Sequence, residues 1–172
     1  MKRAILTKEE QAYWLNQHVR TRVHAVLASR ANIDQLRAAQ PKGSVSFMEH
    51  DFIFHATWEG QHAAMRWLLE FIGVESREGR EMVTICCFEG GVPLESRDQK
   101  YAELKDIWVA CSKATSHPTT GKHPEIEEPI LHKAAEFIVK HLAAIYARAG
   151  VTPLPIIEFV TAPEVPPSTT GK

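Results

Sequence analysis

The sequence lacks several features that would point directly to a function. Its 172 residues contain no run of about 18 to 20 apolar residues, which a membrane span requires, and residues 1–6 are too short for a signal-peptide core. Twenty basic residues stand against 21 acidic ones, and the net charge of −1 creates no overall field for nucleic acid or anionic membranes. We therefore expect a cytoplasmic protein without membrane contact.

Cysteine is scarce, and recognisable cofactor motifs are missing. Cys86 and Cys87 are adjacent and Cys111 is distant, so they form neither a disulfide framework nor a CxxC zinc pair. We expect three reduced thiols in the core. The sequence has no HxxxH or HExxH motif, and its glycines lack the lysine of a phosphate-binding loop. No cofactor is predicted.

Helical periodicity begins after a capping box at Thr7–Glu10 and is repeated in three later segments. A second capping box, Ser46–Glu49, precedes a long apolar stripe that ends before Gly73, and a third helix is expected over about 101–116. A fourth starts with acids and a proline at 127–129. The buried positions predicted for these helices are Leu15, Val19, Val23, Val26, Leu27, Phe54, Trp58, Met65, Leu68, Leu69, Ile72, Tyr101, Leu104, Trp108, Cys111, Leu131, Ala135, Ile138, Leu142, Ile145 and Tyr146.

Between the second and third helices, residues 82–88 form a short β-prone apolar run that closes with Gly90 and Gly91. We predict a strand or a buried extended segment there. The chain is thus expected to be mainly all-α: an antiparallel four-helix bundle with a short β-prone insert between helices two and three. The bundle domain covers residues 1–150, and residues 151–172 form an extended Pro/Thr-rich tail that is partly disordered.

The fourth helix carries a second apolar line on its outer side. Ile130, Phe137, His141 and Ala144 lie roughly 90 to 130° from the buried stripe at 100° per residue. Either the tail or the insert covers this line, or it forms a homodimer interface through Ile130, Phe137 and His141.

The third helix ends in the sequence Ser112-Lys113-Ala114-Thr115-Ser116-His117. This segment resembles the polar-to-histidine half of the motif of the HEPN superfamily, all-helical bundles of which many are metal-independent ribonucleases in defence and toxin systems. The resemblance covers the helical layout of residues 7–149. The motif's arginine would fall on Cys111 or Ser112, and this chain has none there.

The resemblance implies a defence- or toxin-type domain that acts on RNA, or a non-catalytic relative. His117 would transfer a proton while Lys113 and Ser112 assist, and Ser116 and Thr119 would hold a phosphate. Histidine beside a proline at a helix end is also a common C-terminal cap, so His117 has a purely structural alternative.

Two other functions stay open from the residues themselves. Nine histidines are an unusual number, and helical bundles place metal ligands on facing helices. A metal centre would combine His50, His55 and His62 with His132 or His141. The second alternative is a non-enzymatic dimeric interaction module that uses the fourth helix. Arg20 and His24, one helical turn apart, face either a phosphate or solvent.

Overall fold

The computed structural model describes residues 4–27, 47–75, 82–116 and 126–152, with backbone alone at 47–56 and 116. The predicted C-terminal tail lies almost wholly outside these residues. The described part is mainly α-helical and contains no strand, which confirms the predicted all-α class. None of its helices is long and apolar enough to cross a membrane.

The first helical segment is α1 (Lys8–Trp14), η1 (Leu15–Val19) and α2 (Arg20–Leu27) in direct succession. The predicted capping box is present: Glu10 N–H donates to Thr7 Oγ1, and Thr7 N–H donates to the Glu10 carboxylate at 2.8 Å. The middle element, η1, is π-helical, because the Arg20 N–H donates to the Leu15 carbonyl five residues earlier. The wider turn was not predicted.

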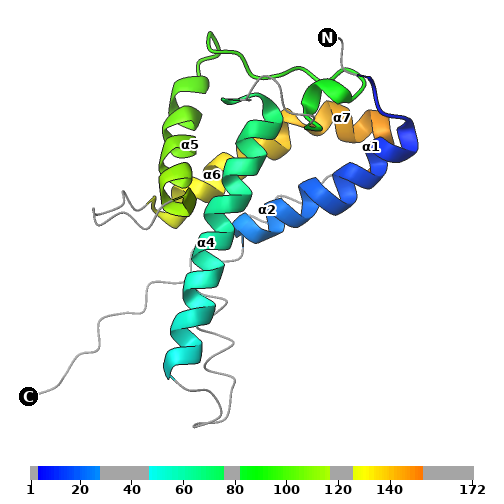
Figure 1. Cartoon of the computed structure of the whole chain (residues 1–172). Helices are drawn as coiled ribbons and strands as arrows, with labels where there is room; N and C mark the ends of the chain where they lie inside the picture. Colours follow the sequence, from blue (N-terminus) through cyan, green and yellow to red (C-terminus); the bar gives the residue numbers. More distant parts are fainter. Residues whose placement is uncertain (1–3, 28–46, 76–81, 117–125, 153–172) are drawn as a thin grey trace, which may run out of the picture.

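Helix α4 (Phe47–Ile72) is the element on which the others pack. It contacts α2 and α5 extensively and α6 as well, and α2 and α5 lie on opposite sides of it in Figure 1. The helix ends at Gly73, whose φ of 111° few other residues adopt. Trp58 was predicted in the core but is only half-buried, and its ring lies 4.2 Å from the ring of His62 on the same helix.

The segment after α4 is buried but does not form the predicted strand. Residues Ile85–Cys87 form the single 3-10 turn η2, with extended residues on either side. Its carbonyl at Cys87 accepts from the Leu6 N–H at 2.8 Å, so the turn is joined to the chain entering α1. Ile85 and Phe88 are both 1% exposed. The apolar run is therefore a plug that fills the core without pairing as a strand.

Helix α5 (Tyr101–Ser116) follows, with Leu104 and Cys111 buried as predicted and Trp108 half-buried against the core. The predicted fourth helix is divided into α6 (Glu128–His141) and α7 (Ala143–Ala149). Leu142, at φ −85° and ψ −5°, leaves helical geometry between them.

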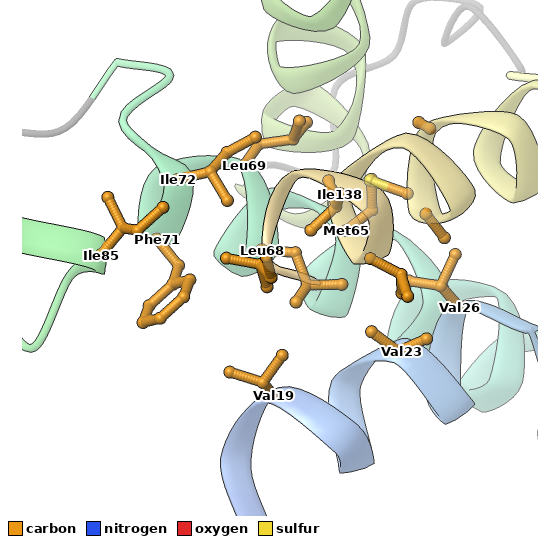
Figure 2. Close-up of a cluster of buried hydrophobic side chains, with 14 of the residues drawn as sticks. Val19, Val23, Val26, Met65, Leu68, Leu69, Phe71, Ile72, Ile85 and Ile138 are labelled. Carbon is orange, nitrogen blue, oxygen red and sulfur yellow. The ribbon is translucent and has the colours of Figure 1, made fainter. Parts of the chain in front are cut away.

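Helix α7 ends at Gly150, with φ 68°, where the Val151 N–H donates to the Tyr146 carbonyl at 3.0 Å. The hydrophobic core lies between α2, α4, η2 and α6. In Figure 2, Val19, Val23 and Val26 approach α4, while Ile138 enters from α6. The predicted stripe of the first helix is confirmed at those valines. The regular antiparallel arrangement of four helices stays a prediction.

Candidate functional site

The C-terminal turns of α5 carry the residues that the sequence singled out. Lys113 is exposed, whereas Ser112 is half-buried. Within the described residues, the buried Ser112 Oγ has no hydrogen-bond partner. Ser116 ends α5 with only its backbone described, and His117 and Thr119 lie outside the described residues. Ser112 and Lys113 thus lie in the last turns of α5, five and four residues before the predicted proton-transfer residue in the sequence.

Cys111, on the same turns of α5, is a core residue as predicted. Its side chain is fully buried, and burial raises the pKa of the thiol to about 12. The carbonyl of Cys111 accepts a hydrogen bond from the Thr115 hydroxyl at 2.9 Å. A thiol with so high a pKa holds almost no thiolate near neutral pH and cannot serve as a nucleophile.

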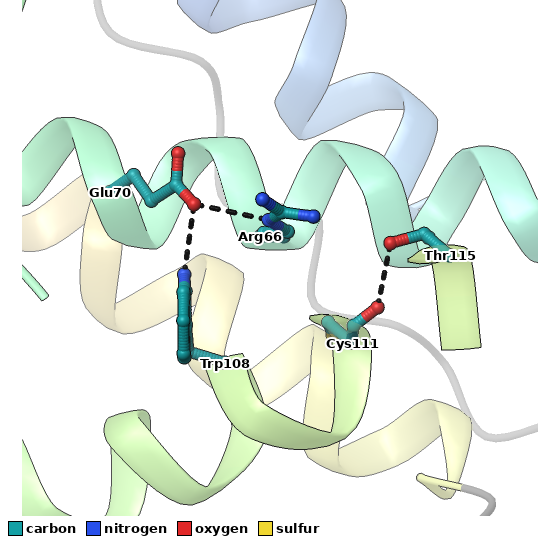
Figure 3. A network of polar contacts seen from close by, with 5 residues as sticks. All are labelled: Arg66, Glu70, Trp108, Cys111 and Thr115. Carbon is teal, nitrogen blue, oxygen red and sulfur yellow. Dashed lines mark hydrogen bonds and ion pairs between the residues drawn. The ribbon is translucent and has the colours of Figure 1, made fainter. Parts of the chain in front are cut away.

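A polar network between α4 and α5 lies beside these turns. Glu70 Oε1 accepts hydrogen bonds from Arg66 Nε–H at 3.0 Å and from Trp108 Nε1–H at 3.1 Å (Figure 3). The Glu70 side chain is only 12% exposed. Two charge-assisted bonds to one partly buried carboxylate hold both donors in fixed orientations.

Arg66 brings a guanidinium to α5 from another helix. Its Cζ lies 6.0 Å from the centre of the Trp108 ring, and its positive charge opposes the burial that raises the pKa of Cys111. In Figure 3, Arg66 lies between Glu70 and Thr115. Arg66 belongs to no motif that the sequence shows. Its spacing of four residues from Glu70 signals a helical ion pair, but only the fold shows that the pair faces α5.

The histidines do not gather in the part of the chain that the structure describes. No group of three histidine, cysteine, aspartate or glutamate side chains within those residues is placed to hold a metal ion. His62 is 1% exposed, and its Nδ1–H donates to the Trp58 carbonyl at 2.7 Å. His132 Nε2 lies 3.7 Å from Glu128 Oε1, one helical turn away. For His50 and His55 the structure describes only the backbone.

Several other candidates are placed clearly. Arg20 and His24 are both exposed, as the solvent-facing interpretation expected. Cys87 is buried, but Cys86 is exposed, so the prediction of three buried thiols is wrong at that position. The 3-10 turn explains the difference. Successive side chains of such a turn point to different sides of the backbone, and only one side of this turn faces the core.

The second apolar line of the fourth helix is partly covered. His141 Nε2–H donates to the Val92 carbonyl at 2.9 Å, and the His141 ring is stacked with Phe137 at 6.0 Å. Phe137 packs against the core. Ile130 remains 42% exposed and Val92 65% exposed. The chain that follows the apolar insert thus contacts the line at His141, whereas Ile130 and Ala144 at its two ends are exposed.

No family model matches this chain, and the comparisons with curated proteins and with solved structures yield no match. The function is therefore argued from the chain's own residues.

Proposed function

We propose that this protein is a HEPN-like helical domain that acts on RNA at the C-terminal end of α5. The observation that carries the proposal is the position of Arg66. The motif in α5 has no arginine of its own. Arg66 on α4 lies beside Trp108 and Cys111, which precede His117 by nine and six residues. A guanidinium from a neighbouring helix supplies the fixed positive charge that the motif lacks.

The chemistry follows from the residue types. Arg66 and the exposed Lys113 offset the negative charge that develops on a phosphate during attack by the neighbouring ribose hydroxyl. His117 transfers a proton, and the Ser112 hydroxyl, which lacks a partner among the described residues, offers a donor. Glu70 accepts the Arg66 Nε–H and so fixes the plane of the guanidinium. No metal ion is required.

Cleavage of end-labelled single-stranded RNA in the presence of EDTA tests this function. We expect His117→Ala to abolish cleavage with little change in melting temperature. Arg66→Lys keeps the charge but loses the planar fork, and should lower the rate at least about tenfold. Lys133→Ala, an exposed change on α6, is the matched control and should cleave normally.

Two results would contradict the proposal. Full cleavage by His117→Ala, combined with a stability loss of about 1 to 2 kcal/mol, would identify His117 as a helix cap alone. Loss of wild-type cleavage on chelation would indicate a metal-dependent reaction and would favour a metal centre formed by the histidines.

A dimeric interaction module is the second candidate, and the exposure of Ile130 favours it. An exposed branched aliphatic residue that continues a line through Phe137 is typical of an interface edge. Ile130→Glu should convert a dimer to monomers in sedimentation velocity at tens of micromolar. It tests the interface better than Phe137→Glu, because Phe137 also packs against the core. A wild-type chain that sediments as a monomer would exclude this interface.

A further inference from the structure

The first helical segment has an uneven distribution of charge. No aspartate or glutamate occurs between Glu10 and Asp34, although the whole chain is nearly neutral. The described part of this stretch, residues 11–27, contains two arginines, two histidines, a tyrosine and a tryptophan. The acids of the helical segment, Glu9 and Glu10, are confined to the first turn of α1. The cations and aromatic rings that follow attract polyanions locally, where the net charge of the chain would not.

The π-helical turn η1 organises the aromatic part of this stretch. The His18 ring lies 4.2 Å from the Trp14 ring and 5.7 Å from the Tyr13 ring, at interplanar angles of 35° and 74°. Tyr13 and His18 are five residues apart, a spacing that a regular α-helix does not place on one side, and the wider turn brings them together. Single π-helical turns inside α-helices occur frequently at functional sites.

Arg22 extends this group towards α4. Its guanidinium carbon lies 4.0 Å from the centre of the Trp67 ring, and its Nη1–H donates to the His18 carbonyl at 3.1 Å. Trp67 is in turn stacked on the buried Phe71, with ring centres 5.2 Å apart. The cation is therefore held over a ring that is itself stacked on a core residue.

The positive charge of this group is not neutralised within the described residues. Neither Arg22 nor the exposed Arg20 has an ion pair there, and His18 makes only ring contacts through its side chain. Tyr13 is 58% exposed, and Trp14, His18 and Trp67 are half-buried. The exposed Tyr13 ring, the half-buried Trp14 and His18 rings and the unpaired arginines are thus available to a ligand that has both rings and negative charge, whereas Trp67 is occupied by Arg22 and Phe71.

We infer that Tyr13, Trp14, His18, Arg22 and Trp67, here called the η1 surface, bind single-stranded polynucleotide. Unpaired bases stack on the rings of Tyr13, Trp14 and His18, Trp67 holds the Arg22 guanidinium in place, and Arg20 and Arg22 attract the phosphates. In a duplex the base faces are covered, so this surface selects single strands. The inference rests on the proposed function for its choice of RNA as the natural ligand. The surface lies on α1–α2, and Figure 1 shows α5 on the other side of α4.

Binding is measured by fluorescence anisotropy with a labelled 12-nucleotide uridine RNA, with the full chain carrying His117→Ala so that cleavage does not interfere. We expect micromolar binding that weakens with salt and is accompanied by quenching of tryptophan fluorescence. A DNA strand of the same length should also bind, whereas duplex RNA should bind less well. Tyr13→Ala should weaken binding about fivefold or more, and Arg22→Gln should weaken it further and reduce the salt dependence.

Val92→Ala is the matched control for Tyr13→Ala, and Arg97→Gln is the matched control for Arg22→Gln, because both positions are exposed and lie elsewhere. Tyr13 is exposed on a helix, so its replacement by alanine should leave folding intact, which circular dichroism checks. The inference is overturned if the RNA does not bind at about 100 µM, if duplex binds as tightly as single strands, or if the η1 variants bind like the controls.

The two proposals fail separately. Normal binding without any cleavage by the wild-type chain would contradict the site on α5 and support the η1 surface. Cleavage that persists in Tyr13→Ala and Arg22→Gln with an unchanged KM for RNA would support the site on α5 and contradict the η1 surface.

Discussion

The imidazole of His62 donates its Nδ1–H to the Trp58 carbonyl one helical turn earlier, at 2.7 Å, and its ring lies 4.2 Å from the Trp58 ring. This bond fixes the neutral tautomer with the proton on Nδ1. Nε2 is buried without a hydrogen-bond partner in the described part of the chain. Protonation would place a second N–H, and a positive charge, where nothing described accepts them.

This geometry predicts a dependence of stability on pH. Burial lowers the pKa of His62, only partly opposed by the bond to Trp58, and burial also lowers the pKa of His132. As the pH falls, these two histidines take up protons near pH 6.5 in the unfolded chain but only at a lower pH in the folded chain. Stability should thus be complete above about pH 6.5 and fall at lower pH, by at most about 1.4 kcal/mol per pH unit for each group.

Urea unfolding at several pH values between 7.5 and 5.5 measures this slope. His62→Gln removes one titrating group and should flatten it, even if the variant is less stable at every pH. Equal slopes for His62→Gln and the parent would show that His62 takes up its proton without cost to folding.

The sequence contained more information about the first helix than its amphipathic pattern revealed. Gln11, Leu15, Val19 and Val23 are spaced by four residues each time, and all are buried. An α-helix of 3.6 residues per turn would rotate such a series gradually off the core face. The wider turn η1 corrects that drift, so the strict spacing of four is the local signal for the π-helix.

The candidate site was less predictable, because its geometry depends on which helices face one another. The helical periodicity predicts that Cys111 lies in the core and that Ser112 and Lys113 lie off the buried face of α5. Periodicity could not show that Arg66 lies near Cys111 and Trp108, since Cys111 follows Arg66 by 45 positions in the sequence. The apolar run 82–88 was identified as buried but not as a turn, because composition reports burial more reliably than backbone shape.

Thiol reactivity should distinguish the three cysteines. Cys86 is exposed, Cys87 is buried, and burial raises the pKa of Cys111 to about 12. The folded protein should therefore react rapidly with Ellman's reagent at one thiol, and the remaining two should react only after unfolding. Cys86→Ser should remove the fast phase. Two fast thiols in the folded parent would mean that η2 is not packed as described.

Replacement of Gly91 or Gly60 by alanine should change the stability of the fold in opposite directions. A Cβ at Gly91 would lie 1.9 Å from the Ile85 carbonyl oxygen, so the backbone of the plug must move, at a cost of about 1 to 3 kcal/mol. Gly60 lies within α4 with open space around it, and alanine there should stabilise the fold by about 0.5 to 1 kcal/mol. Thermal melts of the two variants check the signs. A stable Gly91→Ala variant would contradict the close approach to Ile85.

The shared carboxylate of Glu70 should contribute more to stability than an exposed ion pair does. Glu70→Gln keeps the shape of the side chain but removes the charge to which Arg66 and Trp108 both donate. Because hydrogen bonds to a partly buried charged group are strong, we expect a loss of about 1 to 3 kcal/mol in the free energy of unfolding.

Glu136→Gln is the matched control for this change. Its partner Lys140 is also four residues away, at 2.6 Å, but the two side chains are 43% and 62% exposed, so solvent screening should limit the loss to about 0.5 kcal/mol. Urea unfolding compares the two variants at one pH, and the emission of Trp108 should shift only in Glu70→Gln. Equal losses would show that the seam between α4 and α5 is as open to water as the surface of α6. Arg66 would then not be held in the fixed orientation that the site on α5 requires.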